Sequence, residues 1–120
     1  MKNIYFINEN TNKKLNIIAY SHLFLRFDND EIIINSFIEK GLFTHRLVRG
    51  ETTTLSLGDI ASLRFYKSNG VLYLEIKLDN SSLKLNTKNW KDENIKNFID
   101  LLKDKFVIQN INLYEKYLAK

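Results

Sequence analysis

Along the first three-quarters of the chain apolar and polar residues alternate, with the period of two that is typical of strands with one face on a core. Segments with this pattern run over 15–20, 22–27, 32–38, 42–48, 52–57, 60–67, 72–79 and 82–87. The segment over 32–38 is apolar on both faces, since Ile33 and Phe37 lie opposite its other isoleucines. This composition indicates a strand that is central in its sheet or covered by another layer.

Short breaks rich in Gly, Asn and Asp separate these segments. They fall at 28–30, 40–41, 49–51, 58–59, 69–70 and 79–81. Asn69-Gly70 is the clearest of them, because both central residues of a type I′ turn need a positive φ and this pair adopts it at little cost. Asp28-Asn29-Asp30 indicates a second tight turn, since these side chains hydrogen-bond the nearby backbone. We therefore expect a three-stranded antiparallel meander over 60–87.

After Thr87 the hydrophobic period changes from 2 to 3.6 residues, which indicates a helix. One stripe of this helix consists of Ile95, Phe98, Ile99, Leu102 and Phe106. Asn89 and Asp92 resemble a capping box, with Asp in the usual Glu position. We expect a helix over 90–106 that lays its stripe on the sheet. The predicted contacts in the core join Leu74, Ile76, Leu85, Phe98, Ile99 and Leu102.

Strands first and one long helix last define an α+β order, without the alternation of a parallel sheet. The sequence predicts a strongly bent antiparallel sheet, or partly open barrel, of about seven strands closed by one C-terminal amphipathic helix. With 120 residues and 44% hydrophobic residues the chain fits one folded domain over 1–120. Its core spans 15–106, and the tail over 107–120 has the apolar spacing of a possible second short helix.

The composition excludes several kinds of site and indicates where in the cell the protein is located. The absence of cysteine excludes a disulfide framework, a thiolate metal site and a cysteine nucleophile. The net charge of +4 comes from Lys and Arg interleaved with acids, as on an ordinary solvated surface. No apolar run approaches the roughly 20 residues of a membrane span, and the N-terminus lacks the apolar core of a signal peptide. We expect a cytoplasmic protein without a transmembrane segment, unless a route without a cleaved signal delivers it elsewhere.

The order of motifs in the second half carries a family resemblance. Thr54-Leu55-Ser56-Leu57-Gly58-Asp59-Ile60 enters a strand, the Asn69-Gly70 hairpin and two further strands follow, and Trp90 precedes the helix. The two further strands contain Leu72-Tyr73-Leu74-Glu75-Ile76 and Leu83-Lys84-Leu85. Residues 22–106 resemble a bacterial pleckstrin-homology-like domain. In this comparison the predicted hairpin over 27–34 corresponds to the first hairpin of that fold.

The resemblance implies a binding scaffold, a curved sheet capped at one end by its helix. Lipid-binding members of this family carry Lys and Arg in the first hairpin loop. Here that loop is Asp28-Asn29-Asp30-Glu31, which is acidic and repels a phosphoinositide. The resemblance therefore favours protein binding over binding of a lipid headgroup.

The motifs of common catalytic and metal sites are missing. His22 and His45 are the only histidines, and neither has a partner four residues on, as in His-Glu-x-x-His. The acidic turn at 28–31 has isoleucines where a calcium loop needs a ligand and a glycine. Four glycines leave little room for a nucleophile elbow or a phosphate-binding loop. We expect no enzyme, no cofactor and no metal, although a carboxylate pair brought together by the fold stays possible.

One basic segment, 40–49, is poor in acids and lies between the turns at Gly41 and Gly50. Its glycines indicate a projecting loop or ribbon, and loops on a rigid scaffold are the usual seat of recognition. We predict that an acidic protein surface is contacted by Phe43, His45, Arg46 and Arg49. Nucleic acid is disfavoured because no RNP-type strand, helix-turn-helix or Arg-rich arm accompanies these charges. A solvated loop and an interface on the tail at 114–118 are the alternatives.

Two functional classes fit a small protein without catalytic residues. One is a non-catalytic, regulatory protein-binding module of pleckstrin-homology-like type. The other is a small immunity or inhibitor protein that neutralises a bacterial toxin or enzyme. The sequence does not separate them and leaves the oligomeric state open. A toxin gene beside this one would favour the second class.

Overall fold

The computed structural model describes residues 4–8, 22–40, 46–79 and 81–120. Within these ranges the chain forms eight strands, two α-helices and a short 3-10 helix. In chain order they are β1 (Ile4–Asn8), β2 (His22–Asp28), β3 (Glu31–Lys40), β4 (Arg46–Ser56), η2 (Leu57–Asp59), β5 (Ser62–Ser68), β6 (Val71–Lys77), β7 (Ser82–Asn86), α1 (Glu93–Lys105), β8 (Ile108–Gln109) and α2 (Ile111–Leu118).

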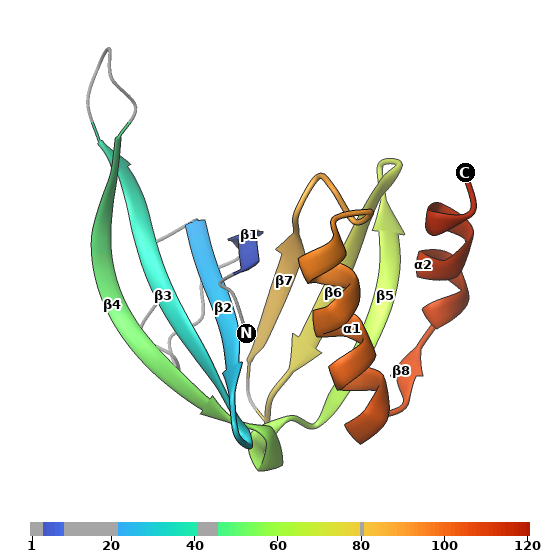
Figure 1. Ribbon diagram of the computed structural model, residues 1–120, viewed down its shortest axis with the longest axis horizontal. Helices are drawn as coiled ribbons and strands as arrows, with labels where there is room; N and C mark the ends of the chain where they lie inside the picture. The colour runs from blue at the N-terminus through green and yellow to red at the C-terminus, as the bar shows by residue number, and fades with distance from the viewer. Residues whose placement is uncertain (1–3, 9–21, 41–45, 80) are drawn as a thin grey trace.

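The strands form one sheet in the order β4-β3-β2-β1-β7-β6-β5-β8. It is strongly bent, and Figure 1 shows β2–β4 and β5–β7 as the two arms of a V. Strands β1–β7 pair antiparallel, whereas the two-residue β8 runs parallel to β5. The α+β class and the antiparallel sheet are therefore confirmed. The sheet is not closed into a barrel, since β4 and β8 end the strand order, and β8 is a parallel strand that the sequence pattern did not predict.

The two arms are joined by β1, a strand that the sequence analysis did not predict. It pairs with β2, where Phe6 lies opposite Leu23, and with β7, where Ile7 lies opposite Asn86. The sequence analysis took the hairpin between β2 and β3 as the first antiparallel strand pair of the fold. It is the second, because β1 and β2 pair before it in the chain. The argument from its acidic loop against a lipid headgroup does not extend to the preceding connection. That connection, 9–21, lies outside the described residues, as does the predicted segment over 15–20.

The turn expected at 49–51 is wrong, because β4 runs unbroken through these residues. Asn35 of β3 lies opposite Thr52, but Phe37 lies opposite Arg49, so β4 carries one extra residue there. This is a β-bulge, which bends a strand without ending it. A glycine between charged residues fits a turn and a bulge equally, and only pairing with β3 distinguishes them.

The meander expected over 60–87 is confirmed as β5, β6 and β7. Its first connection is a two-residue turn in which Asn69 has φ 52° and Gly70 has φ 77°. Both values lie in the left-handed region that a type I′ turn requires. The turn fixes the register of β5 on β6 from Ser68 opposite Val71 to Ser62 opposite Lys77.

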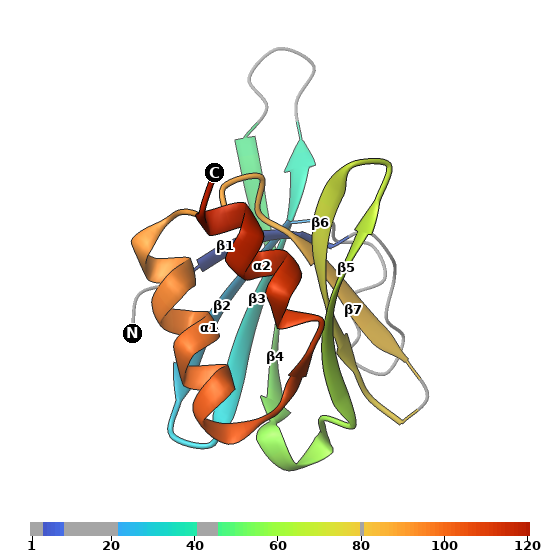
Figure 2. The same cartoon turned by 90° about the vertical axis from the view of Figure 1, so that its right-hand side faces the viewer.

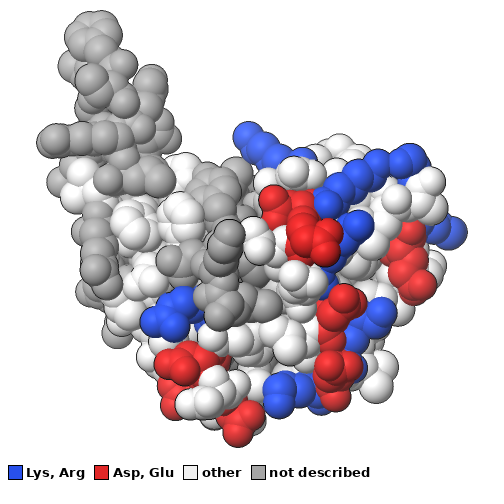
Figure 3. Space-filling model, in the orientation of Figure 1, with Lys and Arg blue, Asp and Glu red and all other residues white. Residues whose placement is uncertain are grey.

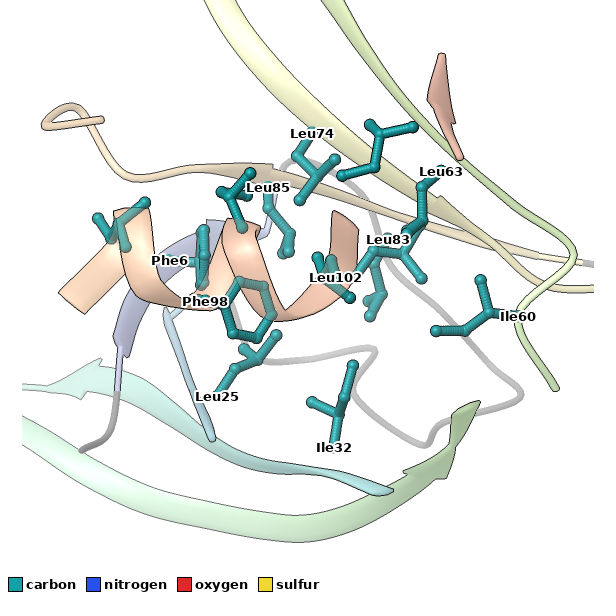
Figure 4. Close-up of a cluster of buried hydrophobic side chains, with 14 of the residues drawn as sticks. Phe6, Leu25, Ile32, Ile60, Leu63, Leu74, Leu83, Leu85, Phe98 and Leu102 are labelled. Carbon is teal, nitrogen blue, oxygen red and sulfur yellow. The ribbon is translucent and has the colours of Figure 1, made fainter. Parts of the chain in front are cut away.

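The core lies between the two arms and beneath α1. All six predicted core residues are buried with no exposed surface, which confirms the prediction, and Figure 4 shows Phe98 and Leu102 of α1 pointing at strands of both arms. The helix is shorter than the expected 90–106. The predicted capping box, with Asn89 as the N-cap, is wrong. Asp92 is the N-cap, and its side chain accepts a hydrogen bond from the backbone N–H of Asn94 at 2.8 Å. Asn89 lies before the helix in a turn.

Trp90 contacts both the meander and the C-terminal helix α2. Its indole Nε1 donates to the carbonyl oxygen of Leu72 at 3.1 Å. Tyr114 of α2 stacks on Phe65 with ring centroids 5.1 Å apart and donates to the carbonyl oxygen of Trp90 at 3.4 Å. Helix α2 therefore packs beside β5, on the side of the molecule that faces the viewer in Figure 2.

Candidate binding surface

The described residues hold no group of three His, Cys, Asp or Glu side chains that could bind a metal ion. His22 is half-buried on β2, and His45 lies outside the described residues. No helix in the described part of the chain is long and apolar enough to cross a membrane.

The predicted contact residues fall on and beside the edge strand β4. Phe43 and His45 lie outside the described residues. Arg46 and Arg49 belong to β4, and the structure gives their backbone register, with Arg46 opposite Lys40 and Arg49 opposite Phe37. Their role in binding an acidic surface stays a prediction.

Charged side chains on the face that carries α1 are mixed in sign. Figure 3 shows Lys and Arg interspersed with Asp and Glu over the described part of this face. At the end of α1, Lys105 lies 3.5 Å from Asp30 in an exposed ion pair. Exposed pairs of this kind contribute about 0–1 kcal/mol. This face is therefore an ordinary solvated surface.

The outer surface of the meander differs, because aromatic and charged side chains meet there in a defined geometry. We call it the meander face. By strand alternation it comprises Ser62, Arg64, Tyr66, Ser68, Val71, Tyr73, Glu75, Lys77, Ser82 and Lys84. The residues between them on the three strands include the core leucines and Phe65, which fix the meander from behind.

At its centre two cross-strand pairs touch each other. Tyr66 and Tyr73 stack with ring centroids 5.3 Å apart and ring planes 16° apart. In the next pair, Arg64 Nε donates to Glu75 Oε1 at 2.6 Å. The guanidinium carbon of Arg64 also lies 4.9 Å from the centroid of the Tyr66 ring, within cation–π range. The four side chains thus form one connected cluster.

Electrostatics reinforce this cluster. The hydrogen bond to Glu75, and the attraction between the two charges, raise the pKa of Arg64 above its ordinary value. On the other side of Glu75, Lys84 of β7 is its register partner. Charges therefore alternate in sign across the three strands, with cations at both ends of the row.

The sequence contained the signal for this cluster. A two-residue turn at Asn69-Gly70 requires Tyr66 to lie opposite Tyr73 and Arg64 opposite Glu75. The alternation over 60–87 therefore assigns these four residues to one face, and the turn sets which of them lie opposite each other. The placement of the guanidinium over the ring depends on side-chain conformation, which the pattern does not contain.

Comparison of the chain with protein-family models, with curated proteins and with solved structures found no match. The case for a function therefore rests on the fold and on the meander face.

Proposed function

We propose that this protein is a non-catalytic, regulatory protein-binding module of pleckstrin-homology-like type, and that its meander face binds the partner. The observation that carries the proposal is the stacked pair of Tyr66 and Tyr73 with Arg64 over it. Aromatic and Arg side chains are enriched among the residues that dominate binding energy at interfaces. Because buried leucines hold the strands from behind, the face loses little conformational entropy when a partner binds.

The architecture supports the same class of protein. A bent antiparallel sheet covered by α1 is the kind of scaffold that the resemblance over 22–106 implies.

Charge favours a partner with an acidic surface. The meander face carries three cations, Arg64, Lys77 and Lys84, and one acid, Glu75. Complementary charge steers a partner to such a face and disfavours partners of the same sign. Single-stranded nucleic acid fits less well, because the carboxylate of Glu75 lies beside the stacked pair, where a phosphate backbone needs cations.

The test is affinity capture from the cells that express this protein, with the wild type compared with Tyr73→Ser. Capture must be saturable and must be reproduced with the purified partner. We expect Tyr73→Ser to weaken binding at least about tenfold, the scale of an interface residue worth more than 1 kcal/mol. Arg26→Gln, on the other arm of the sheet, is the control and should bind normally.

A partner that binds Tyr73→Ser as well as the wild type would contradict the assignment of the meander face. Loss of binding on reversing Arg46 and Arg49 instead would place the interface on β4. Tyr73→Ser and Arg26→Gln must both melt close to the wild type. For Tyr73→Ser this is expected, because a cross-strand pair contributes only about 0.2–1 kcal/mol to folding.

A further inference from the structure

Arg64 differs from an ordinary surface arginine because two contacts fix its guanidinium. Nε is bonded to Glu75, and the group lies over the Tyr66 ring. In the described structure its two Nη groups donate to no protein acceptor. The side chain as a whole is 45% exposed, so a ligand can reach it from solvent. The donors of a fixed arginine therefore remain available to a ligand.

An arginine fixed in this way is suited to one kind of ligand group. The two Nη groups form a planar fork that matches the two oxygens of a carboxylate in a bidentate pair. A mobile arginine loses rotamer freedom when it forms such a pair. Here the contacts to Glu75 and Tyr66 already restrict that freedom, so less affinity is lost on binding.

The charges around Arg64 favour a single carboxylate over a polyphosphate chain. Glu75 is flanked by Arg64 on β5 and by Lys84 on β7, so the row has one excess positive charge. One incoming carboxylate balances this excess. A nucleic-acid backbone instead needs cations spaced along several phosphates. On the meander face, by contrast, the centre of the row is occupied by the carboxylate of Glu75.

We propose that Arg64 is the specificity-determining residue of the meander face, and that its Nη groups bind an Asp or Glu carboxylate of an acidic protein segment. Glu75 is a positioning residue that holds the guanidinium. The inference rests on the proposed function and adds the chemistry of the contact. It commits to a protein partner that presents an Asp or Glu carboxylate to Arg64.

The experiment titrates ¹⁵N-labelled protein with an acetylated peptide of alternating Glu and Ser, followed by amide chemical shifts. The matched peptide replaces each Glu by Gln. We expect the Glu peptide to shift amides of β5 and β6 around Arg64 and Glu75, and the Gln peptide to shift none. Arg64→Gln and Arg64→Lys should each weaken binding about tenfold, because Lys keeps the charge but lacks the fork. Arg26→Gln, which removes one positive charge from the other arm of the sheet, should bind within about twofold of the wild type.

Glu75→Leu separates positioning from net charge. Charge alone predicts tighter binding of the Glu peptide, because an acid has been removed from the face. Positioning predicts weaker binding, because the guanidinium is released, and Glu75→Gln should restore binding by keeping an acceptor for Nε. Thermal melting of each variant shows that the fold is intact.

Several results would overturn the inference. They are the absence of shifts with the Glu peptide, equal binding by Arg64→Gln, tighter binding by Glu75→Leu, and tighter binding of oligothymidylate than of the peptide at the same amides. If Arg64→Gln leaves binding of the captured partner unchanged while Tyr73→Ser abolishes it, the inference fails and the proposed function stands. If the peptide binds as expected but no partner depends on Tyr73, the carboxylate site stands and the proposed function fails.

Discussion

Truncation of Phe98 to Ala tests whether α1 and the two arms share one core. Phe98 has no exposed surface, and its ring lies 5.8 Å from Phe6 of β1 and 5.1 Å from Phe27 of β2. Removal of a buried Phe ring typically costs about 3–5 kcal/mol, from the lost transfer free energy and the cavity left behind. The two aromatic contacts place the expected loss in the upper part of this range.

This loss is large against the stability of a domain, which is about 5–15 kcal/mol. At roughly 2.1 cal/mol/K of unfolding entropy per residue, a loss of about 4 kcal/mol lowers Tm by about 15 °C. The loss of unfolding free energy is measured by urea unfolding followed by the fluorescence of Trp90. Trp90 is the only tryptophan of the chain and lies 6.1 Å from Phe6, so it reports on the same core.

The control is Leu101→Ala, an apolar truncation at a partly exposed position of the same helix. It should cost less than about 1 kcal/mol, the usual range for surface changes. A Phe98→Ala loss no larger than that of Leu101→Ala would refute the reasoning, because the stripe of α1 would then not be in the core.

Four further outcomes are expected. Reversal of Arg46 and Arg49 to Glu should leave Tm nearly unchanged, and it should weaken binding of the acidic partner only if the interface lies on β4 and not on the meander face; a collapse of the fold would show that these residues are structural. Gly70→Ala should cost about 1–2 kcal/mol in urea unfolding, because φ is 77° although the added Cβ meets no atom within 4 Å. Burial and the charge of Asp100 raise the pKa of Tyr114 to about 12, so stability should fall as pH rises from about 10, where the unfolded chain ionises, to 12; unfolding of Tyr114→Phe should lack this decline. A hydrolase and transferase screen of the purified protein should give nothing above buffer, and reproducible turnover would contradict the non-catalytic assignment.

The elements that were predicted from the sequence are those whose signals are local. The Asn69-Gly70 turn, the alternation of β6 and the stripe of α1 each lie within a few residues, so pattern and structure agree. Strand β1 has five residues, and its partners are β2 and the distant β7, so it has no local signal beyond a short apolar run. The bulge in β4 was mistaken for a turn because only its pairing with β3 distinguishes the two.

The candidate surface was only partly predictable for the same reason. Alternation assigns Arg64, Tyr66 and Tyr73 to the outer face, and the turn sets which residues lie opposite each other. The rotamer that brings Arg64 onto both Glu75 and the tyrosine ring follows from packing among side chains. Sequence patterns do not contain that information. The basic segment over 40–49 drew attention because charge is visible in a sequence, whereas a prearranged guanidinium is visible only in a structure.

The position of β1 has a consequence for the time course of synthesis on the ribosome. β1 emerges first and can pair with β2 early, but its second edge must wait for β7. The roughly 80 residues that separate them take about 4–16 s to synthesise at ordinary translation rates. During this interval β1 presents an open strand edge, which is a template for pairing with other chains. This edge of β1 is therefore covered only once the segment around Leu85 and Asn86 is complete.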